Sequence, residues 1–270
     1  MKIFAIKSDD RADMLAYLIY YEKDKRFFIE LPDNADPWET PILLSSFADR
    51  KEKTINSYWS KIWVQQRLVP TDRQNLGQIL RDNGLTNYDE YELLMLANGR
   101  CAQDDYYIEP LEERDLPDEL TERFRKKIED MIPLGGGEYL VFFCNGQIKR
   151  CSISKFIKKN ERLAALLKSA PDRSDSAYLM TGGYGIAWND DVTISYSDLY
   201  DNGKNVPLSS SDFTRFVQFR VINAAEAAEL LNCSRQYINE LVKKKKLIPI
   251  KTSDKNTLFL KSDVLKRKWE

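Results

Sequence analysis

The chain has 270 residues, of which 43% are hydrophobic and 31% are charged, a composition typical of folded globular proteins. This length exceeds that of most single domains, so two or three compact units are expected. No apolar run approaches the roughly 18 residues that a membrane-spanning helix needs, and the N-terminus lacks the apolar core and cleavage site of a signal peptide. We therefore expect a soluble, cytoplasmic protein with no membrane partner.

Histidine is absent from the sequence, which excludes His-activated nucleophiles and imidazole metal ligands. The four cysteines, Cys101, Cys144, Cys151 and Cys233, form no Cys-x-x-Cys pair. Their spacing argues against a zinc site and fits a reducing compartment. The sequence therefore favours a protein that is not an enzyme and has no cofactor or metal. Carboxylate-based catalysis stays open as a third alternative.

Charge is divided unevenly along the chain. Residues 220–270 contain 12 Lys and Arg against 6 Asp and Glu, a net charge of +6. The remaining residues carry a net charge of −7, which the near-neutral total of −1 conceals. A basic segment attached to an acidic body is typical of a nucleic-acid reader joined to other domains.

Residues 1–132 are expected to form a first α+β unit of unknown role. Aromatic and β-branched residues predict two strands within 15–31 around a turn at 22–25. From Thr54 to Pro70 the period becomes helical. Capping boxes at 71–74 and 87–90 predict helices that end at Gly84 and at Asn98-Gly99, and a helical stretch over 117–131 follows.

Aromatic and charged side chains within this first unit have structural interpretations. Trp59 and Trp63 share one helix face and are predicted to be core residues. Three arginines are expected to form internal ion pairs with two neighbouring aspartates; they are Arg67, Arg73 and Arg100, with Asp104 and Asp105.

Residues 133–208 are expected to form a second, small α+β domain. Asn145-Gly146 between two apolar runs predicts a hairpin with a type I′ turn. A helix is predicted over 158–168, and further strands or turns over 177–180, 184–188, 192–195 and 197–200. The hairpin, the Gly185-x-x-Trp188 element and the ending at Tyr200 resemble the family called domain of unknown function 2442. That resemblance implies a fold module without an established activity.

Residues 209–270 are expected to form a third domain, which Ser209–Asp212 would link to the second. Asn223 and Glu226 form a capping box for one helix. Asn232 suits a left-handed turn, and Ser234 is placed to cap a second helix. Strands over 247–250 and 258–260 would flank a turn at 252–256, and a third helix is predicted over 262–269.

The run from Glu226 to Ile238 resembles the core of the excisionase and MerR-like winged helix-turn-helix family. Asn232 replaces the usual turn glycine, and Lys245 stands where a glycine commonly ends the second helix. The resemblance implies a small winged helix-turn-helix that binds duplex DNA. The expected fold class of the whole chain is thus α+β and multidomain, with two α+β units before the reader.

The predicted DNA contacts come from the second helix and the wing. Arg235 can pair bidentately with guanine and Gln236 with adenine, whereas lysines of the helix end and wing suit phosphates. The full set of predicted contact residues is Ser234, Arg235, Gln236, Tyr237, Asn239, Lys243, Lys244, Lys251, Lys255 and Asn256. The alternative for the run Lys243–Lys246 is a solvated helix end favoured by the helix dipole.

The leading hypothesis is a bacterial DNA-binding transcriptional regulator, such as an antitoxin-like protein or a mobile-element repressor. Residues 1–208 would form a homodimer or bind a protein partner. The alternative is a protein-interaction adaptor, or toxin-neutralising partner, whose DNA module is only autoregulatory.

Overall fold

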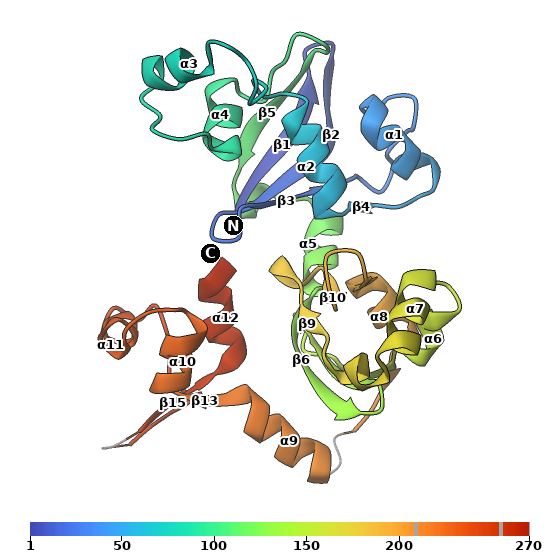
Figure 1. Cartoon of the computed structure of the whole chain (residues 1–270), viewed down its shortest axis with the longest axis vertical. Coiled ribbons are helices and arrows are strands. Elements are labelled where there is room, and N and C mark those ends of the chain that lie inside the picture. The colour runs from blue at the N-terminus through green and yellow to red at the C-terminus, as the bar shows by residue number, and fades with distance from the viewer. Residues whose placement is uncertain (208–209, 254–255, 270) are drawn as a thin grey trace. The chain divides into compact units, whose positions relative to one another are not determined.

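The computed structural model describes residues 1–207, 210–253 and 256–269 (Figure 1). Its contacts group the chain into two compact units, Met1–Thr121 and Glu122–Glu270. Helices and strands occur in both units, in agreement with the predicted α+β class. The finer division into three domains, with boundaries after residues 132 and 208, stays a prediction. No helix of the described residues is long and apolar enough to cross a membrane.

The first unit is built on an antiparallel sheet of order β4-β3-β2-β1-β5. Its strands are β1 (Lys2–Ser8), β2 (Arg11–Tyr21), β3 (Arg26–Glu30), β4 (Thr54–Ile55) and β5 (Tyr106–Leu111). Its helices are α1 (Ile42–Asp49), α2 (Ser57–Gln65), α3 (Leu76–Asp82) and α4 (Glu90–Leu96), and α5 (Asp118–Arg125) spans the unit boundary. The predicted hairpin of β2 and β3 around residues 22–25 is confirmed.

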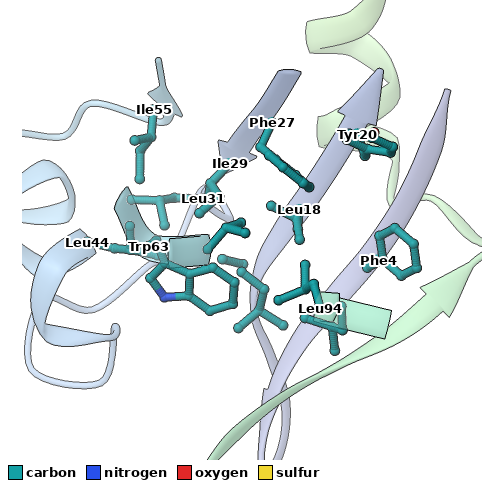
Figure 2. Close-up of a cluster of buried hydrophobic side chains, with 14 of the residues drawn as sticks. Phe4, Leu18, Tyr20, Phe27, Ile29, Leu31, Leu44, Ile55, Trp63 and Leu94 are labelled. Atoms are coloured by element: carbon teal, nitrogen blue, oxygen red, sulfur yellow. The ribbon is translucent and has the colours of Figure 1, made fainter. Parts of the chain in front are cut away.

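One face of this sheet packs on the helices and forms a hydrophobic core (Figure 2). Alternate strand residues such as Phe4, Leu18 and Ile29 point to that face because side chains in a strand alternate sides. Trp63 of α2 is 1% exposed there, as predicted. Trp59 is 38% exposed, so its assignment to the core was wrong.

Two helices of the first unit start later than predicted. The segment after Thr71 forms turns, in which Arg73 N donates to Pro70 O and Leu76 N donates to Arg73 O. Helix α3 therefore begins only at Leu76. The cap of α4 is Asp89, whose Oδ1 accepts from Tyr91 N and Glu92 N at 3.0 and 3.2 Å. Asn87 is not the cap.

The arginines of this unit form ion pairs, but not as one network. Arg67 donates to Asp104 Oδ2 at 2.6 Å and lies 3.7 Å from the centre of the Trp63 ring. Its side chain is 2% exposed, and this burial lowers the pKa of the guanidinium. Arg100 instead binds Asp9 with two hydrogen bonds of 2.6 and 2.8 Å.

Within the described ranges, Arg73 and Asp105 take no part in the predicted ion pairs. Among the described residues Arg73 has no ion pair, and the Asp105 carboxylate accepts from the hydroxyl of Ser8. The prediction of an internal network is therefore confirmed only for Arg67 with Asp104.

The second unit begins with an antiparallel sheet of order β12-β8-β7-β6 and a smaller sheet of order β11-β10-β9. The first contains β6 (Ile128–Gly135), β7 (Glu138–Phe143), β8 (Ile148–Ser152) and β12 (Lys204–Asn205). The second contains β9 (Tyr178–Leu179), β10 (Gly185–Ala187) and β11 (Thr193–Ser195). Helices α6 (Ser154–Ile157), α7 (Glu161–Ser169) and α8 (Tyr196–Asn202) lie between these strands in the chain.

The hairpin of β7 and β8 is confirmed, although its turn differs from the prediction. Gly146 has φ of 81°, whereas Asn145 has no positive φ. Gly146 N donates to Phe143 O, and Phe143 N donates to Gln147 O. This pattern is a three-residue loop closed by a left-handed glycine, and not a type I′ turn.

The helix predicted over 117–131 is too long. It ends at Arg125, and β6 begins at Ile128. Ile128, Asp130 and Ile132 are buried alternately with their neighbours, so burial on a sheet with period two overrides the local helical pattern.

The C-terminal elements are α9 (Ser210–Arg220), β13 (Val221–Asn223), α10 (Ala224–Leu230), α11 (Arg235–Lys243), β14 (Lys251–Thr252), β15 (Thr257–Leu260) and α12 (Lys261–Trp269). Residues 210–212, predicted as linker, begin α9 instead, and Ser209 lies outside the described residues. Strand β13 was not predicted; it pairs with β15 in a sheet of order β13-β15-β14.

Candidate nucleic-acid interface

The start of α10 is fixed by the predicted capping box. Asn223 Oδ1 accepts from Ala225 N and Glu226 N at 2.8 and 3.1 Å, and Asn223 N donates to Glu226 Oε2 at 2.7 Å. These bonds satisfy backbone donors that a helix start leaves without partners. The first helix of the motif therefore begins where the local sequence predicts it.

The turn between α10 and α11 also follows the prediction. Asn232 adopts φ of 50°, a left-handed conformation that asparagine tolerates better than most residues. Cys233 N donates to Ala228 O at 2.9 Å. Ser234 Oγ then accepts from Tyr237 N at 3.2 Å and caps α11. A short turn and a side-chain cap thus set the direction of the second helix.

A small apolar core holds these helices together. Its buried members are Ile222, Ala227, Ala228, Ile238, Leu241, Leu247, Phe259 and Val264. In α11, Ile238 and Leu241 are buried in this core and Val242 is partly buried against it. The remaining faces of α11 are therefore presented to solvent.

The end of α11 contains an unusual lysine. Lys245 adopts φ of 55°, a conformation that costs a residue with a side chain about 1 kcal/mol more than glycine. In return, Lys246 N reaches Leu241 O at 2.8 Å and Leu247 turns into the core. The helix thus ends with the left-handed geometry of a glycine cap at a position that has no glycine.

The first wing strand lies later than predicted. Leu247 is buried in the core, and Pro249 lacks the N–H that a strand ladder requires. Pairing with β15 starts as Ile250 N donates to Leu258 O at 2.9 Å and continues in β14. The strand predicted over 247–250 was therefore wrong, whereas the second strand and the final helix are confirmed.

Nine of the ten predicted contact residues are exposed, and Lys255 lies outside the described residues. Those on or next to α11 are Ser234, Arg235, Gln236, Tyr237, Asn239, Lys243 and Lys244. Lys251 lies in β14, and Asn256 precedes β15. The fold thus brings the predicted set onto one helix and the hairpin that follows it.

Most cations on these two elements have no acidic partner. Among the described residues Arg235, Lys243 and Lys251 form no ion pair, whereas Lys244 Nζ lies 3.4 Å from Glu240 Oε2. This ion pair was not predicted from the sequence, although Glu240 precedes Lys244 by four residues, a spacing that favours such pairs on a helix. The resulting surface is basic, and Glu240 neutralises one of its charges, that of Lys244.

In the parts of the chain that the structure describes, no three His, Cys, Asp or Glu residues are grouped to hold a metal ion. Burial raises the pKa of the Cys151 thiol to about 12. This thiol is therefore less reactive than an ordinary cysteine.

Comparison with known families agrees with this geometry. Residues 221–270 match the family described as "Helix-turn-helix domain". Comparison with curated proteins and with solved structures gives no match. The C-terminal segment of the chain is a helix-turn-helix, a motif through which proteins bind DNA.

Proposed function

We propose that the protein is a transcriptional regulator that reads duplex DNA through α11 and the wing. The observation that supports this most is the start of α11, where Arg235 and Gln236 are exposed directly after the Ser234 cap. In helix-turn-helix proteins this end of the second helix enters the major groove. There a guanidinium can bind guanine and a carboxamide can bind adenine through two hydrogen bonds each.

Phosphate contacts would come from the surrounding lysines. Lys243 is exposed at the end of α11, and Lys251 and Asn256 are exposed on the hairpin. Such contacts add affinity without sequence information and release counterions, so binding should weaken steeply as salt increases. Lys244 should contribute less because Glu240 already neutralises it.

A single small reader covers limited DNA surface, so useful specific affinity implies paired half-sites and two copies of the chain. Residues 1–208 are our candidates for the dimer contacts or for a partner protein. Within this proposal the chain is a cytoplasmic antitoxin-like protein or mobile-element repressor without catalytic activity.

The proposal is tested by fluorescence anisotropy with duplexes from the region upstream of the protein's own coding sequence. We expect salt-dependent binding that Arg235→Ala weakens about 10-fold or more. The matched control is Arg162→Ala, since Arg162 is an exposed arginine paired with Asp191 at 3.1 Å. Absent or salt-independent binding would contradict the proposal, as would equal binding by Arg235→Ala.

A second candidate function is a protein-interaction adaptor whose DNA module is only autoregulatory. It is favoured by two large apolar side chains of the first unit, Trp38 and Ile42, which are 95% and 91% exposed. Exposed apolar groups of this kind are common at protein-binding surfaces. A stoichiometric partner that is retained after deletion of residues 210–270, and lost with Trp38→Ser, would favour the adaptor.

A further inference from the structure

Arg220, the last residue of α9, lies against the sheet that contains β6 and β7. Its guanidinium carbon is 4.4 Å from the centre of the Phe142 ring and 5.2 Å from that of Phe216. Phe142 belongs to β7 and Phe216 to α9, and the two rings are 5.2 Å apart. The Arg220 side chain is only 8% exposed. A charged group has thus been placed in a largely apolar contact between helix and sheet.

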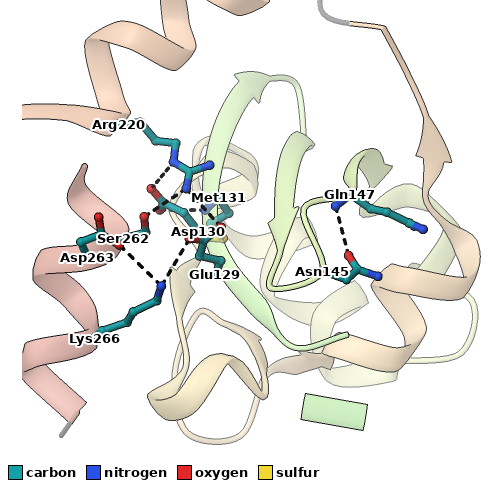
Figure 3. A network of polar contacts seen from close by, with 9 residues as sticks. All are labelled: Glu129, Asp130, Met131, Asn145, Gln147, Arg220, Ser262, Asp263 and Lys266. Atoms are coloured by element: carbon teal, nitrogen blue, oxygen red, sulfur yellow. Dashed lines mark hydrogen bonds and ion pairs between the residues drawn. The ribbon is translucent and has the colours of Figure 1, made fainter. Parts of the chain in front are cut away.

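The same guanidinium joins three elements through polar contacts (Figure 3). Its Nη2 lies 3.2 Å from Glu129 Oε2 and donates to Ser262 Oγ at 3.1 Å. Its Nε lies 3.9 Å from Asp130 Oδ2. Glu129 and Asp130 belong to β6, whereas Ser262 belongs to α12. Arg220 therefore contacts the sheet and the helix-turn-helix at the same time.

A second cation extends this contact. Lys266 of α12 lies 3.9 Å from Glu129 Oε1 and 3.5 Å from Asp263 Oδ1 (Figure 3). Glu129 is therefore shared by two cations, one at the end of α9 and one in α12. Removal of its carboxylate would weaken both connections between β6 and the helix-turn-helix.

The composition of this contact favours precise placement over stability. Burying charges costs desolvation, and their pairing recovers it only in a good geometry. Accordingly, burial raises the pKa of Asp130. An apolar contact such as that between Phe142 and Phe216 tolerates sliding, whereas the hydrogen bond from Arg220 to Ser262 of α12 is directional and its ion pair with Glu129 ties the same guanidinium to β6.

This contact involves none of the predicted DNA contacts. Its residues lie on β6, β7, α9 and α12, whereas the predicted contacts lie on α11 and the hairpin after it. We propose that Arg220, Glu129 and Lys266 are positioning residues that hold the helix-turn-helix on β6, so that α11 is presented from one rigid body. The consequence for DNA reading rests on the proposed function; the docking itself does not.

Fixed docking matters when two readers bind one duplex. If each reader is held in place, binding of the first half-site puts the second reader at a high effective concentration over the next. A reader that moves on α9 would still bind a single half-site. It would lose most of the increase in affinity that the second half-site provides, and it would bind pairs of half-sites at a wider range of separations.

The docking is tested without DNA, in the full-length protein, by the distance between two spin labels. The labels are carried by noncanonical amino acids at Gln147, in the β7–β8 loop, and Glu229, in α10, both exposed. We expect one narrow distance distribution in the wild type, a broad one in Glu129→Ala, and a broader one in Arg220→Met. If Arg220→Met loses its helical circular dichroism signal, that variant is misfolded. The distance distribution of Glu129→Ala then decides whether the docking depends on this contact.

The matched control is Glu138→Ala, because Glu138 in β7 pairs with Arg150 of β8 at 3.1 Å within the same sheet. Its distribution should stay narrow. A broad wild-type distribution, an unchanged Glu129→Ala distribution, or equal broadening in Glu138→Ala would overturn the proposal.

The DNA arm uses duplexes that the wild-type full-length protein enriches from a random pool, with one or two half-sites. Glu129→Ala should bind the single half-site with the affinity of the wild type. Its increase in affinity on adding the second half-site should be about 10-fold smaller than that of the wild type. An undiminished gain would overturn the role in DNA reading. If no duplex is enriched, the proposed function fails, while the spin-label distances still decide the docking.

Discussion

In the first unit, Arg67 lies on the Trp63 ring and binds Asp104 at 2.6 Å, whereas Arg235, at the start of α11, is exposed and has no acidic partner among the described residues. The first arginine is part of the fold and is committed to an internal carboxylate. The second keeps its hydrogen-bond donors available for another molecule. An arginine in the sequence does not by itself indicate a binding site. Its burial and its acidic partners decide whether it stabilises the fold or can bind another molecule.

The largest expected effect is on the buried pair. Arg67→Met should lower the free energy of unfolding by about 3 kcal/mol, because it leaves the Asp104 carboxylate without its buried partner. Urea denaturation measures this loss. Affinity for a selected duplex should stay unchanged once the protein is folded. A stability like that of the wild type would remove the contrast between the two arginines.

Arg235→Ala should have the opposite profile. It is expected to weaken specific DNA binding by about 1–3 kcal/mol and to leave the unfolding midpoint unchanged, since the side chain is exposed. Anisotropy and urea denaturation of the same preparation measure both quantities. A large loss of stability would show that Arg235 belongs to the fold after all.

The helix caps of the two regions extend the comparison. Asp89→Ala in α4 and Ser234→Ala in α11 should each cost about 1 kcal/mol, because each removes an N-cap. The hydrogen bond from Lys25 lowers the pKa of Asp89 below its ordinary value of 3.8. Its contribution is therefore present above that value and lost as pH falls through the lower folded-state pKa.

The stability difference between wild type and Asp89→Ala should accordingly shrink below about pH 4. The difference for Ser234→Ala should not change in that way, since serine does not titrate there. Denaturation series at several pH values compare the two. If the stability differences of both variants change in the same way with pH, the Asp89 carboxylate is not the group responsible.

The smallest expected effect concerns phosphate contacts. Lys251→Ala should weaken binding to all duplexes alike and lower the salt slope by about 1. Lys244→Ala should change the slope less, because Glu240 already lies 3.4 Å away. Titrations at several salt concentrations separate the two. A base-specific effect of Lys251→Ala would mean that this lysine reads sequence.

Local chemistry explains what the sequence predicted well. The capping box of Asn223 and Glu226, the turn at Asn232 and the cap at Ser234 all depend on residues within a few positions of one another. Their donors and acceptors meet wherever the rest of the chain lies, so the helix-turn-helix could be recognised before the fold was seen.

The misses involve partners distant in sequence. Arg220 looked like an ordinary basic residue, because its partner Glu129 lies 91 positions earlier and only the fold brings them together. Strand β13 is too short to show a pattern and exists because β15 pairs with it. Residues 128–131 joined a sheet although the preceding residues favour a helix.

The most direct test is selection of duplexes from a random pool with the full-length protein and its Arg235→Ala variant. We predict that the wild type enriches one sequence motif, that Arg235→Ala enriches it weakly or not at all, and that a chain without residues 221–270 enriches nothing. Enrichment of the same motif by all three proteins, or of none by the wild type, would contradict it.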